Sequence, residues 1–153
     1  MTDPAGAGLI ERTGAGFDGT ALRYWVRRRG PRWLLVCTGY GGTRPAWIPL
    51  LEQLSEEWSV LLWDYRGQFG SDATPGGQPI LIDDHSRDLD ALMETEGIAR
   101  GVLMAWSVGV QVALEHYRRR ASTVDALVLI SGAYEQVLHS PWGPGLGACA
   151  LRN

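Results

Sequence analysis

The sequence contains no lysine, few cysteines and no long apolar run. The last two shortages exclude a disulfide-stabilised domain and a membrane-spanning helix. All 14 basic residues are arginine, which we attribute to codon usage in a GC-rich genome. The 2 cysteines cannot form the disulfide framework of a small secreted domain. No apolar stretch reaches the roughly 18 residues of a membrane-spanning helix, and the first residues lack the features of a secretory signal. We therefore expect a soluble, cytoplasmic protein.

The charge balance excludes a polyanion-binding role. The formal net charge is −3 and the isoelectric point is about 5.6, so no basic footprint for nucleic acid or anionic lipid is present. No cluster of histidine, cysteine and carboxylate residues has metal-ligand spacing. The glycine-rich segment 39–42 lacks the Lys-Ser/Thr ending of a phosphate-binding loop. We expect no metal, no cofactor, and neither nucleic acid nor membrane as a partner.

Apolar runs alternate with helical patterns along most of the chain. Two short strands are predicted at residues 8–12 and 21–28, followed by buried strands at 33–38, 58–64, 102–105 and 126–130. Predicted helices lie between the buried strands, with caps from Thr43 and from Asp83 or Asp84, and with Gly97 ending the second. This alternation predicts an α/β fold with a mostly parallel sheet of about six strands and helices on both faces. We expect an N-terminal strand pair at 1–30, a core at 31–135 and an irregular tail at 136–153.

The segment Ala-Trp-Ser-Val-Gly at residues 105–109 lies between a predicted strand and a predicted helix. A serine on such a turn is typical of a nucleophile elbow, where the hydroxyl projects from the sheet. The next amide, that of Val108, lies at a helix N-terminus and can stabilise an oxyanion. The glycine-rich loop 38–42 would offer the Tyr40 amide as a second donor. Without Ser107, that loop would be interpreted as a plain turn before a helix.

Taken together, four segments resemble the α/β-hydrolase fold family, especially its esterase, lactonase, cofactor-free perhydrolase and peptidase-like members. The similarity runs from about residue 20 to residue 135, and the matching segments are residues 37–42, 63–71, 87–92 and 104–113. The resemblance implies Ser107 as the nucleophile and the amides of Tyr40 and Val108 as the oxyanion hole. It also implies that Asp64, Arg66 and Gly67 form a structural turn at the rim of the site.

Two positions depart from the residues that are usual in this fold family, and a third distinguishes the chain from some of its members. Ala105 stands where glycine is usual, and Thr38 stands where many members carry a histidine that supports the oxyanion loop. A small side chain at position 105 is compatible with the turn. Serine at position 107 differs from the aspartate of dehalogenases and epoxide hydrolases of this fold, and therefore favours attack on a carbonyl.

The resemblance implies a base histidine after the last strand of the sheet and an acid after the strand before it. The sequence extends only past its sixth predicted strand, so we expect both positions to be absent and little turnover by this chain. Candidates for the base are His85, expected to be solvated in the first turn of a helix, and His139. Glu135 is the candidate acid, and His116 is expected to be structural.

Seven tryptophans raise the question of a ligand box. Packing explains those at positions 33, 47, 58 and 63, which fall on predicted strands or a helix face. Trp106 precedes the serine, and two interpretations stay open for it, core packing and lining of a pocket.

These observations lead to two functional hypotheses. The first is a serine hydrolase of a small ester, thioester or lactone, or a truncated remnant of one. The alternative is a non-catalytic fragment, a binding or interaction module, or half of a split enzyme. The strand at 126–130 becomes an apolar sheet edge, so self-association through that edge is predicted.

Overall fold

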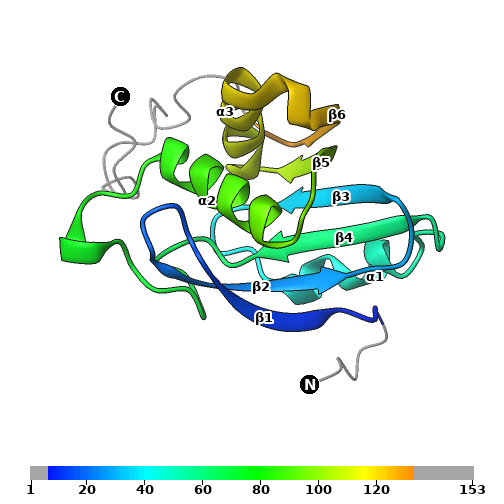
Figure 1. Cartoon of the computed structure of the whole chain (residues 1–153), viewed down its shortest axis with the longest axis horizontal. Helices are drawn as coiled ribbons and strands as arrows, with labels where there is room; N and C mark the ends of the chain where they lie inside the picture. The colour runs from blue at the N-terminus through cyan, green and yellow to red at the C-terminus, as the bar shows by residue number, and fades with distance from the viewer. Residues whose placement is uncertain (1–6, 133–153) are drawn as a thin grey trace.

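The computed structural model describes residues 7–132, which form one sheet flanked by helices (Figure 1). The strand order is β1-β2-β4-β3-β5-β6, with β4, β3, β5 and β6 parallel and with β1 and β2 antiparallel to their neighbours. The mostly parallel six-stranded sheet is therefore confirmed. The strands are β1 (Ile10–Ala15), β2 (Ala21–Arg27), β3 (Arg32–Cys37), β4 (Trp58–Trp63), β5 (Gly101–Trp106) and β6 (Val124–Ile130).

Three α-helices connect the parallel strands: α1 (Ile48–Leu51), α2 (Ile82–Thr95) and α3 (Gly109–Arg120). Short 3₁₀ turns occur at Arg44–Ala46, Pro75–Gly77 and Ala121–Thr123. The predicted first helix is much shorter than expected, because prolines at positions 45 and 49 restrict it to a 3₁₀ turn and a four-residue α1. In the described part of the chain, no helix is long and apolar enough to cross a membrane.

Alternate residues of the central strands form two separate cores, one on each face of the sheet. One face packs against α2 and α3, and the other against α1 (Figure 1). The first core includes Leu35, Cys37, Leu61, Trp63, Leu103, Leu89 and Val112. The second includes Leu34, Val36, Val60, Leu62, Trp47 and Leu51. Burial on both faces explains why these strands are continuous apolar runs in the sequence.

The ends of α2 are set by local hydrogen bonds. The sequence suggested Asp83 or Asp84 as the N-cap of α2, and this is wrong. The N-cap is Leu81, whose N–H donates to the Asp84 carboxylate at 2.7 Å. An aspartate in the first turn satisfies an orphan amide as well as an N-cap does. The C-terminal prediction is confirmed, because Gly97 has φ +63° and the Ile98 amide closes onto the carbonyl of residue 93.

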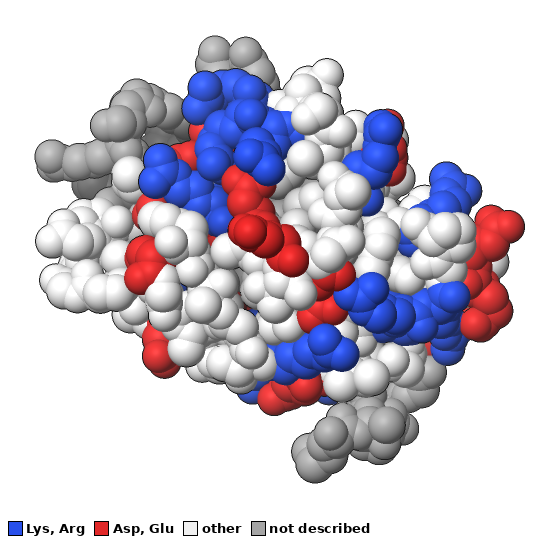
Figure 2. Space-filling view, in the orientation of Figure 1, with Lys and Arg blue, Asp and Glu red and all other residues white. Residues whose placement is uncertain are grey.

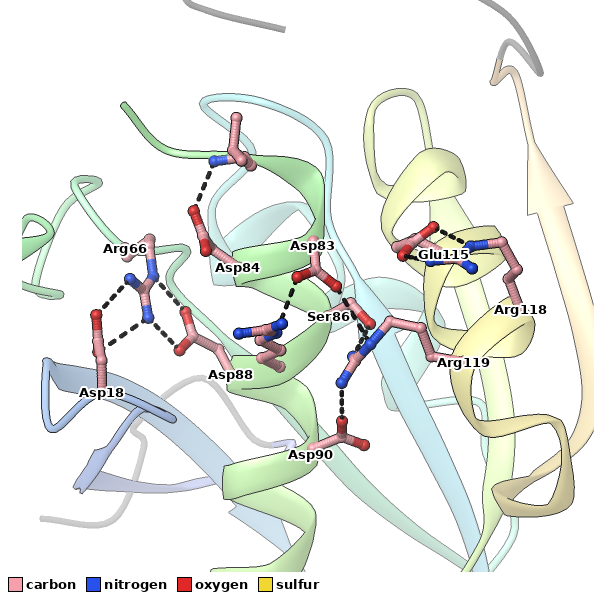
Figure 3. Close-up of polar contacts among 12 residues, drawn as sticks. Asp18, Arg66, Asp83, Asp84, Ser86, Asp88, Asp90, Glu115, Arg118 and Arg119 are labelled. Atoms are coloured by element: carbon pink, nitrogen blue, oxygen red, sulfur yellow. Dashed lines mark hydrogen bonds and ion pairs between the residues drawn. The ribbon is translucent and has the colours of Figure 1, made fainter. Parts of the chain in front are cut away.

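Charged side chains of both signs are interspersed over the face shown in Figure 2, with arginines grouped over α3. Arg119 of this group crosses to α2, where it donates to Ser86 Oγ at 2.7 Å and to Asp90 at 3.1 Å (Figure 3). The arginines at the end of α3 therefore complement the helix dipole and also tie α3 to α2.

The strand β6 lies at one edge of the sheet, where it pairs only with β5 among the described residues. Val128, Leu129 and Ile130 are 37–44% exposed. The apolar edge strand predicted from the sequence is present in this part of the chain.

Candidate active site

Ser107 occupies the sharp turn between β5 and α3. Its φ is +56°, a left-handed conformation that costs energy for a residue with a Cβ and is frequent at functional sites. The Ser107 amide donates to the Ile130 carbonyl at 3.0 Å, and the Ser107 carbonyl accepts from the Val110 amide at 3.0 Å. These two bonds hold the strained turn between the edge strand and the first turn of α3.

Glycines allow the elbow to pack closely against the end of β3. A Cβ on Gly109 would lie 2.1 Å from the Cys37 carbonyl oxygen. A Cβ on Gly39 would lie 2.8 Å from the Trp106 ring and 3.3 Å from the Ser107 Cβ. The loop after β3 therefore runs close to Trp106 and Ser107, while Ala105 is fully buried and its methyl group is accommodated in the core.

The loop at residues 38–42 is held by hydrogen bonds at both ends. The Thr38 hydroxyl accepts the indole N–H of Trp47 at 3.2 Å, and the Thr38 carbonyl accepts the hydroxyl of Tyr65 at 2.9 Å. At the far end, the Gly41 amide donates to the Gln68 side-chain oxygen at 3.0 Å. Thr38 therefore has supporting partners of its own in place of the expected histidine.

The two amides expected to form the oxyanion hole belong to residues next to this close approach. Tyr40 follows Gly39, which lies near Ser107, and the Tyr40 side chain is exposed. Val108 precedes α3, and among the described residues its amide donates to no carbonyl. The N-terminus of a 12-residue helix carries a positive partial charge that favours an anion at this amide.

The loop after β4 forms the structural turn that the resemblance implied. Asp64 accepts the Arg23 guanidinium at 2.7 Å and the Gly70 amide at 3.0 Å. Arg66 is fully buried and donates to Asp88 at 2.6 and 2.8 Å and to Asp18 at 2.9 Å (Figure 3). Burial opposes the charge of Arg66, but its bonds to Asp88 and Asp18 raise the pKa of the guanidinium.

His85 is not the solvated residue that the sequence suggested. It is 8% exposed, and its ring stacks on Tyr65 with the centroids 4.4 Å apart. Because α2 begins at Ile82, residue 85 faces the sheet instead of the solvent. Burial, and secondarily the charge of Arg66, lowers the pKa of His85 to about 3. In the part of the chain that the structure describes, no hydrogen bond joins His85 to Ser107.

The other candidates divide between the core, the surface and the undescribed part of the chain. His116 is buried in α3 and lies 3.0 Å from the Thr123 hydroxyl, in a structural position. His139 and Glu135 lie outside the described residues. Trp106 is 39% exposed beside Ser107, so it is not a fully buried core residue. Within residues 7–132, no group of histidine, cysteine and carboxylate residues is arranged to hold a metal ion.

Three residues support the site in a way that the sequence did not indicate: Trp47, which was explained by packing alone, and Tyr65 and Gln68. The sequence places them near the correct sheet edge, but nothing in its pattern shows that their polar atoms reach the loop after β3. Phe69, next to Gln68, is one of three described non-glycine residues with a positive φ, at +47°; the others are Ser107 and Ser131.

The mostly parallel sheet with an elbow after β5 is the α/β-hydrolase fold. The profile of the alpha/beta hydrolase fold family matches residues 32–150, and the chain belongs to that family. The chain is 28% identical over 100 residues to a Caulobacter segnis protein named "Putative carbamate hydrolase RutD". That match covers 65% of the chain and 37% of the relative.

Solved structures agree with this assignment. Cfl2 from Burkholderia cenocepacia superposes with a TM-score of 0.78 at 25% identity, over 94% of this chain and 49% of Cfl2. A Pseudomonas aeruginosa protein described as a "putative epoxide hydrolase" has a TM-score of 0.73 at 30% identity, over 84% of this chain and 42% of its own. The chain spans less than half the length of each of these proteins.

Proposed function

We propose that this chain carries the nucleophile and oxyanion hole of a serine hydrolase that cleaves a small ester, thioester or lactone. The observation that carries the proposal is the left-handed Ser107, held between β5 and α3 in a member of this family. The Ser107 oxygen attacks the substrate carbonyl carbon while a base takes the hydroxyl proton. The alcohol or thiol then leaves with a proton, and water releases the acyl group as a carboxylic acid.

The amides of Tyr40 and Val108 would bind the negative oxygen that forms during the attack. The close approach of Gly39 to Ser107 supports this role for the Tyr40 amide, because the loop runs beside the proposed nucleophile. Position at the start of α3 supports it for Val108. Trp106, exposed beside the serine, would line the acyl pocket.

The substrate class follows from the nucleophile. A serine oxygen suits a carbonyl, whereas the aspartate of epoxide hydrolases of this fold suits an epoxide. A carbamate, the class in the name of the RutD relative, carries a carbonyl that serine can attack in the same way. We therefore propose that the substrate is a carbonyl ester in the broad sense, carbamates included.

The described residues place no base beside Ser107. No histidine or carboxylate within residues 7–132 hydrogen-bonds to Ser107, so we propose that the base comes from outside this range. His139, another segment of the protein or a separate polypeptide would supply it. The exposed apolar edge of β6 favours the second candidate function, half of a split enzyme, because such an edge accepts a further strand.

The experiment combines turnover with covalent labelling of the purified chain. We expect little hydrolysis of p-nitrophenyl esters and almost no change in Ser107→Ala, since a nucleophile without its base keeps only the contribution of the oxyanion hole. An excess of a fluorophosphonate should still modify Ser107 faster than Ser131, which also has a positive φ and serves as the internal control. Peptide mapping by mass spectrometry measures both sites.

Equal labelling of the two serines would contradict the proposal. Robust hydrolysis that Ser107→Ala abolishes would instead show that a base is present, and His139→Ala and His85→Ala would then identify it. If neither substitution mattered, a copurifying partner would be the source.

A further inference from the structure

The hydrogen bonds of the loop after β3 leave very little freedom to its peptide groups. The Thr38 carbonyl accepts from Tyr65, and the Gly41 amide donates to Gln68. The Gly39 carbonyl between them accepts the Gly42 amide at 2.9 Å. Three successive peptide planes are thus each fixed by one hydrogen bond.

The direction of the Tyr40 amide follows from the middle plane. The Gly39 carbonyl and the Tyr40 N–H belong to the same trans peptide group and therefore point in opposite directions. Because the carbonyl is turned toward Gly42, the N–H is turned to the other side of the loop. This turn needs glycine at position 41, where φ is +68°, and at position 42, where a Cβ would lie 2.3 Å from the Thr38 hydroxyl.

Tyr65 and Gln68 project from a single rigid segment, residues 64–72. The Gln68 amide donates to the Tyr65 carbonyl at 3.0 Å, and the Ser71 amide donates to the Gln68 carbonyl at 3.0 Å. The Tyr65 ring is buried between Trp63, 5.2 Å away, and His85. Arg66, which lies between the two, is held by its buried carboxylate partners. Such a preorganised support can maintain the position of a loop that it touches.

We infer that Tyr65 and Gln68 are positioning residues of the oxyanion hole, bracing the loop at residues 38–42 so that the Tyr40 amide stays directed to the reacting carbonyl. This inference rests on the proposed function. Neither side chain touches the substrate; each acts through the loop. Gln68 does so from a half-exposed position and Tyr65 from a buried one.

The test combines amide hydrogen exchange by NMR with fluorophosphonate labelling of Ser107, in Gln68→Met and Tyr65→Phe. The Gly41 amide should exchange about 10-fold faster in Gln68→Met, because its acceptor is lost. Labelling of Ser107 should slow about 10-fold in both variants, a fraction of the effect of removing an oxyanion donor outright. Gln68→Glu keeps an acceptor oxygen and should restore the slow exchange of Gly41.

The matched control is Gln53→Met, which replaces an exposed glutamine whose side chain makes no hydrogen bond within residues 7–132, and it should change neither measurement. Unchanged Gly41 exchange in Gln68→Met, or equal effects from Gln53→Met, would overturn the inference. If Ser107 of the parent is labelled and neither Gln68→Met nor Tyr65→Phe changes the labelling rate, the positioning role alone would be overturned. A parent in which Ser107 is not labelled would overturn the proposed function as well.

Discussion

Replacing His85 by phenylalanine should make the stability of the folded chain less dependent on pH. Phenylalanine keeps an aromatic ring against Tyr65 but cannot bind a proton. In the parent, burial lowers the pKa of His85 from 6.5 to about 3, so the folded chain holds this ring neutral at neutral pH. Within residues 7–132, the Nδ1 atom of the ring is buried with no hydrogen-bond partner, and the substitution therefore breaks no bond at that atom there.

The sign of the effect follows from proton binding. Between pH 6.5 and pH 3, the unfolded chain carries a proton on residue 85 that the folded chain excludes. The unfolded state therefore gains stability as the pH falls, and the free energy of unfolding decreases. From pH 7 to pH 5, this one residue should remove about 2 kcal/mol from the parent and nothing from the variant.

Urea unfolding followed by tryptophan fluorescence at pH 7, 6 and 5 measures this difference. The other histidines are common to both proteins, so the difference between parent and His85→Phe isolates residue 85. Parallel pH profiles for the two proteins would refute the reasoning, since they would mean that His85 titrates alike in the folded and unfolded chains.

Three further predictions concern packing, the buried ion pair and the sheet edge. Gly109→Ala should unfold the chain or shift α3, as measured by circular dichroism, because the new methyl group would lie 2.1 Å from a carbonyl oxygen of β3. Arg66→Met, which leaves Asp88 buried without its partner, should lower the free energy of unfolding in urea by about 3–5 kcal/mol, whereas Arg87→Met at an exposed position should cost less than about 1 kcal/mol. Leu129→Arg on β6 should reduce self-association in size-exclusion chromatography; a parent that is already a stable monomer would contradict this.

Local patterns in the sequence were sufficient for the fold class and for the position of Ser107 on the turn between β5 and α3. The continuous apolar runs of β3, β4 and β5 predict strands covered on both faces, and the run after Ser107 has the period of a helix. A serine between the two can lie only on the turn. Gly97 also ends α2 as predicted, because a left-handed C′ residue is a local requirement.

The supports of the site were decided only by tertiary structure. Whether His85 is solvated depends on which side of α2 faces Tyr65, and a residue near the start of a helix carries no local mark of that side. The hydrogen bond from the Gly41 amide to the Gln68 side chain joins residues 27 positions apart. They lie on loops that become neighbours only because β3 and β4 pair in parallel. Hydrogen bonds across such distances depend on strand order and register, whereas the strands themselves depend on hydrophobic period. The sequence therefore determined where Ser107 lies, and the assembled sheet determined what holds the groups around it.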